Sequence, residues 1–113
     1  MIDDRRRLHD ILTAIADAAL IVEHGRARFD DDPLTVRAAK NIVTEIGEAV
    51  KALSVATTDA MPDVPWRAIA RMRDRTIHQY PEVDLDVLWD TMAADLPELA
   101  TKIRAHTDRN DND

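Results

Sequence analysis

Two side chains near the end of the segment Trp66 to Tyr80, WRAIARMRDRTIHQY, could together act on a phosphate ester. Arg73 carries a planar guanidinium that can hold two phosphate oxygens through parallel hydrogen bonds. His78 titrates near neutral pH, so it can accept a proton and return it. The pair predicts a site that binds phosphate and transfers protons.

Helical geometry separates Arg73 from the other arginines of the segment. At about 100° per residue, the side chains within about 60° of Arg73 are mostly apolar. They are Trp66, Ile69, Ala70, Ile77 and Tyr80. Arg67, Arg71 and Arg75 fall on the polar side together with His78. Because an unpaired charge on a buried face is costly, either Glu45 or Glu48 of the preceding helix pairs with Arg73, or Arg73 lies at a wet interface.

Arg73 and His78 do not share a face of one ideal helix, since five residues correspond to a separation of about 140°. The two side chains converge if the helix loosens before Pro81. They also converge if a second copy of the chain supplies one of them. A two-fold contact beside this helix would bring both copies of the segment together and pool their cations.

The apolar periodicity predicts four helices, which together position this segment. The first runs from about residue 3 to 24, and the second begins at Pro33, behind an Asp32 cap, and reaches about residue 54. The third starts at residue 65 or 66 and stops before Pro81. The last carries apolar residues from 85 to 103, and Pro97 kinks or restarts it after Asp95. Short connections favour an all-α, antiparallel up-and-down four-helix bundle. We expect residues 1–105 to form a single domain and the polar residues 106–113 to form a disordered tail.

The composition excludes several classes of protein. A net charge of -7 repels polyanions, so the chain is not expected to bind DNA, and any contact with RNA must be local. The sequence has no cysteine, which excludes disulfides and thiolate metal sites and fits a cytoplasmic location. His9, His24 and His106 are scattered, so we expect neither a metal nor another cofactor. No apolar run suggests a signal peptide or a membrane span.

The motif and its flanks resemble those of the HepT-like toxins of the HEPN superfamily. That family has an arginine, a polar residue, three further residues, a histidine, one residue and a tyrosine, and Arg73, Asp74, His78 and Tyr80 occupy these positions in order. The family's second helix resembles the segment DPLTVRAAKNIVTEIGEAVKAL, and its lead into the motif resembles VPWRAIARMR. Its last helix resembles VDLDVLWDTMAADLPEL. The resemblance covers about residues 3 to 104. Asp74 stands where close relatives often have Asn, and Gln79 stands where many have Gly.

The resemblance implies an HEPN-like homodimer that acts as a metal-independent endoribonuclease on an RNA such as tRNA or mRNA, with paired motifs at the dimer interface. It implies that the chain is the toxin of a type VII HepT/MNT toxin–antitoxin pair. Its partner would be an MNT-type nucleotidyltransferase antitoxin, which silences the toxin by transferring AMP to Tyr80. Arg73, Asp74 and His78 would be the catalytic residues.

The predicted residues suit RNA cleavage without a metal. This reaction needs a base for the 2'-hydroxyl, an acid for the 5'-oxygen and positive charge at the phosphate. His78 can serve as base and acid, with one copy from each protomer, and Arg73 can stabilise the phosphate. Arg71 and Arg75 would bind RNA and draw it towards the site.

A second hypothesis is a helical binding subunit without catalytic activity. Such a subunit would hold a nucleotidyltransferase, or the nucleotide of that enzyme, through the same arginines. Asp74, Gln79 and the acidic net charge favour it.

Overall fold

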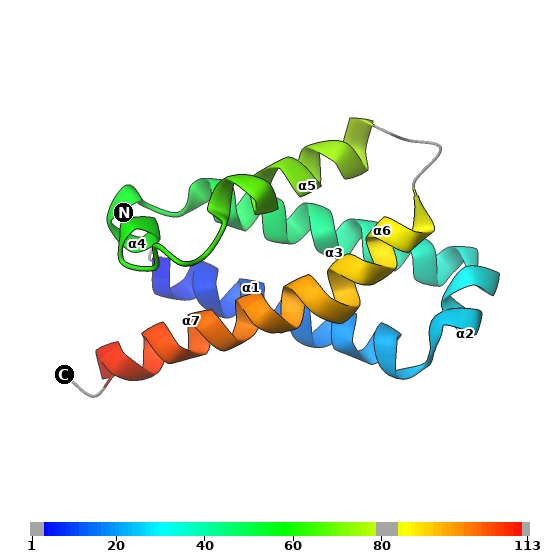
Figure 1. Cartoon of the computed structure of the whole chain (residues 1–113), viewed down its shortest axis with the longest axis horizontal. Coiled ribbons are helices and arrows are strands. Elements are labelled where there is room, and N and C mark those ends of the chain that lie inside the picture. Colours follow the sequence, from blue (N-terminus) through cyan, green and yellow to red (C-terminus); the bar gives the residue numbers. More distant parts are fainter. Residues whose placement is uncertain (1–3, 79–83, 112–113) are drawn as a thin grey trace.

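The computed structural model describes residues 4–78 and 84–111, with residues 75–78 described as helical backbone only. Every regular element in this part of the chain is a helix, which confirms the all-α prediction. The four longest elements lie up, down, up and down, as the sequence predicts (Figure 1). They are α1 (Asp4–Glu23), α3 (Pro33–Ala52), α5 (Trp66–His78) and the continuous run of α6 (Leu85–Asp90), η1 (Thr91–Asp95) and α7 (Leu96–Asp111).

Two short helices lie in the connections, where the sequence pattern predicts only turns. The first, α2 (Arg26–Asp31), follows Gly25, whose φ of 93° favours glycine. Its Phe29 is fully buried, so one aromatic side chain anchors this helix to the core. The second, α4 (Val55–Asp59), begins at Ser54, whose hydroxyl accepts a hydrogen bond from the Thr57 amide. Both helices depend on local contacts that apolar periodicity does not reveal.

The predicted start of α3 is confirmed by its cap. Asp32 accepts hydrogen bonds from the Leu34 amide at 3.0 Å and from the Thr35 hydroxyl at 2.8 Å, and Pro33 occupies the first helical turn. These contacts satisfy groups that the helix itself leaves unpaired. They fix the direction in which α3 leaves α2.

Asp4 joins the first turn of α1 to α4. Its carboxylate accepts a hydrogen bond from the Thr57 hydroxyl at 2.6 Å and from the Ser54 amide at 3.1 Å, and Arg7 lies 3.3 Å away. The hydrogen bonds from Ser54 and then Thr57 lower the pKa of Asp4 to about 2. The charged carboxylate of Asp4 therefore ties the start of α1 to the segment that follows the end of α3.

The last helix is interrupted where Pro97 predicts an interruption. Residues Thr91–Asp95 form a π-helical turn, in which the Leu96 amide donates to the Thr91 carbonyl. Pro97 has no amide to offer to the carbonyl four residues earlier, so a wider turn replaces the regular one. The Thr91 hydroxyl donates to the Val87 carbonyl at 2.9 Å. This hydrogen bond satisfies the Thr91 hydroxyl, so the polar side chain can be buried where the π turn packs against the bundle.

The carboxyl-terminal helix extends further than expected. Residues 106–111, expected to belong to a disordered tail, are the last turns of α7, and Asn110 contacts the His106 ring at 3.1 Å. These residues are polar, but adding turns to a helix that is already packed costs much less than nucleating one. None of the described helices is long and apolar enough to cross a bilayer.

The core lies between α1, α3 and the α6–α7 run. Its largest fully buried side chains are Phe29, Ile11, Ile46, Met61, Met92, Leu96 and Ile103. Trp66 and Trp89 pack at its edge. Trp66 donates its indole N–H to the Met61 carbonyl at 3.1 Å, and the Trp89 ring lies 5.5 Å from the Phe29 ring, tilted by 46°. Within the described part of α5, Ile69 is the buried side chain, and α3 is the element that α5 packs against extensively. The other described side chains of α5, within residues 66–74, are partly or fully exposed.

Candidate active site

Arg73 lies where α5 crosses α3 at close range. Gly47 of α3 faces it so closely that a Cβ added at Gly47 would lie 2.1 Å from the Arg73 Cβ. Glycine is therefore the residue that allows the two helices to approach. The Arg73 side chain is 24% exposed, so it is largely covered at this crossing but not fully buried. The prediction that Arg73 belongs to the inward stripe of its helix is confirmed.

Four charged side chains surround this crossing, and we call them the α3–α5 charge cluster: Glu48, Lys51, Arg73 and Asp74. The Nη2 atom of Arg73 pairs with Glu48, and Nη1 donates to Asp74 Oδ1 at 2.9 Å. Lys51 Nζ donates to the same Asp74 oxygen at 2.9 Å. Of the two carboxylates expected as partners of Arg73, Glu48 is the one that binds it.

The charge cluster shifts the pKa values of its own members. Hydrogen bonds from Lys51 and then from Arg73 lower the pKa of Asp74. The hydrogen bond to Asp74, followed by the attraction of Glu48, raises the pKa of Arg73 above its ordinary value. Both groups are therefore charged at neutral pH. The Nε of Arg73 is buried and has no hydrogen-bond partner among the described residues.

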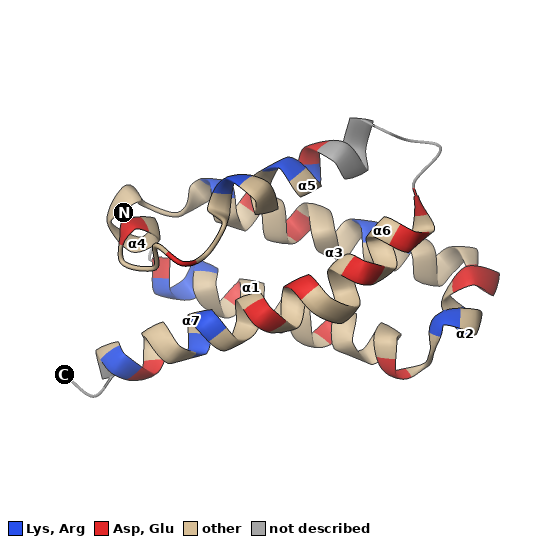
Figure 2. Ribbon diagram, viewed as in Figure 1, with Lys and Arg blue, Asp and Glu red and all other residues tan. Residues whose placement is uncertain are grey.

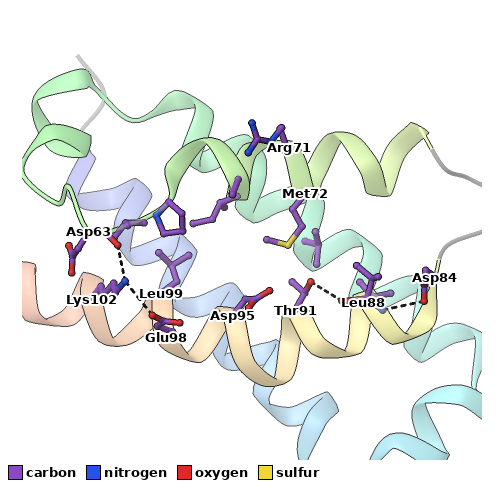
Figure 3. A pocket seen from close by; sticks show the side chains of 16 residues that line it. Asp63, Arg71, Met72, Asp84, Leu88, Thr91, Asp95, Glu98, Leu99 and Lys102 are labelled. Carbon is purple, nitrogen blue, oxygen red and sulfur yellow. Dashed lines mark hydrogen bonds and ion pairs between the residues drawn. The ribbon is translucent and has the colours of Figure 1, made fainter.

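Arg71 lies on a different face of α5 from Arg73. It lines a groove of about 670 Å³ between α5 and the α6–α7 run, which is shown in Figure 3. The apolar lining includes Ile69, Met72, Leu88 and Leu99. The structure therefore brings Arg73 and Asp74 together and places Arg71 elsewhere, as the 100° periodicity predicts.

The far wall of this groove is acidic. Its carboxylates are Asp84, Asp95 and Glu98, and Lys102 bridges Glu98 at 3.3 Å and the Asp63 carbonyl at 2.8 Å. Partial burial, followed by repulsion from Glu98 and Asp90, raises the pKa of Asp95. Figure 2 shows Lys and Arg along much of α5, and Asp and Glu along α6 and the start of α7, whereas the rest of α7 carries charges of both signs. A polyanion would approach the α5 side of the groove.

Three predicted site residues fall where no side chain is described. Arg75 and His78 belong to the last turn of α5, and Tyr80 lies outside the described residues. The convergence of His78 with Arg73 therefore stays a prediction. Among the side chains that the structure describes, which do not include His78, no three histidine, aspartate or glutamate residues gather in an arrangement suited to a metal ion.

Lys51 and Gly47 are site residues that the sequence analysis missed. A glycine inside a strongly periodic helix signals a close approach of another backbone, and Gly47, Glu48 and Lys51 lie within one turn of α3. That spacing could have indicated the face that meets α5. Which residue of α5 they contact depends on the register between the two helices, and the sequence alone does not give that register.

Comparison with known proteins identifies the family. The family described as "Ribonuclease HepT-like" matches residues 11–106. A protein of Caldanaerobacter subterraneus, provisionally named an RNase, is 38% identical over 76 residues, covering 67% of this chain and 68% of the relative. "Probable ribonuclease HepT" of Thermococcus cleftensis is 38% identical over 103 residues, covering 87% of this chain and 94% of the relative.

A third relative is a longer protein. It comes from Methanocaldococcus jannaschii, and its name joins a gamma-glutamylcyclotransferase to a provisional RNase; it is 33% identical over 112 residues, covering 93% of this chain and 49% of the relative. No solved structure matches the chain. The extent of these matches and the helical fold lead to one conclusion: the chain belongs to the HepT-like ribonuclease family.

Proposed function

We propose that the protein is a metal-independent endoribonuclease whose site is completed by a second copy of the chain. The observation that carries the proposal is Arg73, a partly exposed side chain whose guanidinium is held at a helix crossing by Glu48 and Asp74. A preorganised arginine can hold the phosphate of RNA and stabilise the charge that develops on it. Family membership supports RNA as the substrate.

The proposed reaction uses the 2'-hydroxyl of the substrate as the nucleophile. His78 of one protomer accepts the 2'-hydroxyl proton while the 2'-oxygen forms a bond to phosphorus. The bond from phosphorus to the 5'-oxygen breaks, and His78 of the other protomer donates a proton to that oxygen. The products are a 2',3'-cyclic phosphate and a free 5'-hydroxyl, and Arg73 stabilises the crowded phosphate between them.

The position of Tyr80 suggests how this activity is controlled. Tyr80 follows His78 by two residues and falls on the same side of the helix as Arg73, so a phosphate attached to its oxygen would lie near the proposed phosphate site. We propose that a nucleotidyltransferase antitoxin attaches AMP there, and that the added anion occupies the site of the RNA phosphate. The chain would then be the toxin of a HepT/MNT pair.

The decisive test measures RNA cleavage by the purified protein in the presence of EDTA. We expect cleavage by the native chain, and we expect His78→Ala to lower the rate by at least about a hundredfold, as loss of a general acid–base group does. His9→Ala removes an exposed histidine from α1 and serves as the matched control. Cleavage that needs a metal ion, or that survives His78→Ala, contradicts the proposal.

The regulatory part has its own test. Intact-mass measurement after co-expression with a nucleotidyltransferase antitoxin should show the mass of one or more AMP groups, mapped to Tyr80 by fragmentation. Tyr80→Phe should abolish the added mass. An inhibited but unmodified toxin would show that the antitoxin acts by binding alone.

One structural observation favours the second hypothesis, a binding subunit without catalytic activity. The guanidinium of Arg73 is already paired with Glu48 and Asp74, as it would be in a purely structural role. A tight complex with a nucleotidyltransferase that depends on Arg73, together with no RNA cleavage by the isolated chain, would support this alternative.

A further inference from the structure

The charge balance at Arg73 depends on a residue of another helix. Arg73 contacts two carboxylates, Glu48 and Asp74, so these three side chains alone carry a net charge of -1. A site with that charge would repel a phosphate. Lys51 of α3 restores the balance, because its Nζ donates to the Asp74 oxygen that Arg73 also binds. The two cations and two carboxylates of the α3–α5 charge cluster then sum to zero.

Lys51 is arranged to act through Asp74. Both Lys51 Nζ and Arg73 Nη1 lie 2.9 Å from Asp74 Oδ1, so the carboxylate bridges the two cations. Lys51 comes one turn after Gly47 on α3, and the close crossing at Gly47 fixes the register that brings its side chain to Asp74. Without Lys51, the full negative charge of Asp74 would act on Arg73.

We propose that Lys51 is a positioning residue of the phosphate site, setting the charge and orientation of Arg73 by neutralising Asp74. The proposal rests on the function proposed above, in which Arg73 binds an RNA phosphate. It assigns Asp74 a divided role: the carboxylate orients the guanidinium, and Lys51 prevents it from cancelling the guanidinium's charge. Lys51 itself need not touch the substrate.

This role predicts that the effect of losing Lys51 depends on the charge at position 74. Lys51→Met keeps the length of the side chain and removes its charge. It should weaken RNA binding by about tenfold, because Asp74, no longer shared with Lys51, would compete with the phosphate for the Arg73 guanidinium with the strength of about one charged hydrogen bond. When Asp74→Asn is also present, the acceptor oxygen remains without its charge, and Lys51→Met should then change the affinity by less than about threefold.

The experiment measures two quantities for the native chain, the two single variants and the double variant. The first is the dissociation constant for a 2'-O-methyl RNA, which cannot be cleaved, and the second is kcat/KM for the matching unmodified RNA in EDTA. Lys51→Arg should retain native affinity, because it restores the charge. Lys102→Met removes one positive charge from α7 and controls for the change in net charge.

The outcomes separate this inference from the proposed function. If Lys51→Met weakens RNA binding equally with and without Asp74→Asn, Lys51 contacts RNA directly and the inference is wrong, although cleavage that depends on His78 would leave the proposed function intact. If the dependence on Asp74 appears in binding and no variant cleaves RNA, the phosphate site stands and the nuclease proposal fails. If the native chain binds no RNA, both fail.

Discussion

At the scale of single residues, the fold relies on a few carboxylates that act in their charged form. Asp32 and Asp84 cap α3 and α6, Asp74 bridges two cations, and Asp4 ties α1 to α4. Each accepts hydrogen bonds that a protonated carboxyl group would accept less well. The excess of acidic residues in the composition is therefore partly structural.

Asp4 provides a test of this dependence on charge. Its pKa is lowered to about 2 from 3.8, so the stabilisation it provides is fully present above its pKa in the unfolded chain and is lost as the pH falls towards 2. Asp4→Asn should lower the urea midpoint at pH 6. Because protonation of Asp4 removes the same stabilisation from the native chain in acid, the difference in urea midpoint between the native chain and Asp4→Asn should shrink from pH 4 to pH 2.

The matched control for Asp4 is Asp17→Asn, which removes an exposed carboxylate from the same helix. A constant difference between the native chain and Asp4→Asn across this pH range would contradict the assignment. In that case the hydrogen bonds to Ser54 and Thr57 would not depend on the charge of Asp4.

At the scale of elements, the α3–α5 crossing positions the site, and Gly47 sets its distance. Elsewhere in a helix, replacing glycine by alanine stabilises a protein by roughly 1 kcal/mol. At Gly47 the added methyl group would overlap the Arg73 Cβ. The free energy of unfolding should therefore change in the opposite direction, with Gly47→Ala destabilising the fold by about 1–3 kcal/mol, as overpacking does.

Chemical denaturation of Gly47→Ala tests the crossing, and Asn41→Ala, at an exposed position of the same helix, controls for helix propensity. A stabilised Gly47→Ala protein would show that α3 and α5 do not approach as closely as described. The same variant should also weaken RNA binding, because it displaces the Arg73 guanidinium from the proposed phosphate site.

The four main helices could be predicted because their apolar residues recur at helical spacing and their ends carry capping signals. Asp32 with Pro33 gave the start of α3, and Pro97 gave the interruption before α7. The short helices α2 and α4 could not be predicted, since their positions depend on Phe29 entering the core and on Asp4 reaching Ser54 across the chain.

The candidate site could be predicted in part. Periodicity alone separated Arg73 from Arg71, because faces of a helix follow from sequence spacing. The choice of Glu48 over Glu45, and the presence of Lys51, depend on how two helices are aligned and could not be read from either helix alone. The meeting of Arg73 with His78 remains a prediction.

At the scale of the whole molecule, the proposed mechanism divides one reaction between two protomers. Each site uses His78 from both chains, so a dimer with one altered histidine should be inactive. When native chain and His78→Ala chain are mixed and allowed to exchange subunits, cleavage activity should follow the square of the native fraction. A linear dependence would show that each protomer carries a complete site.

The exchange experiment requires a check that subunits mix. Native mass spectrometry of differently tagged chains should show the statistical proportions of the three dimers. A chain that remains monomeric at the concentrations used for RNA cleavage would contradict the composite site directly.

The attachment of α5 through one main neighbour has a consequence for motion. Within its described residues α5 fully buries one side chain, Ile69, and its extensive packing is with α3, whereas α1 and α3 share the core with several neighbours. Segments with few buried apolar contacts open at a lower free energy than the rest of a protein. We therefore expect α5 to unfold or swing as a unit while the other helices stay in place. The helix that carries the chemistry would then be the one that can rearrange around a bound RNA at the lowest cost in stability.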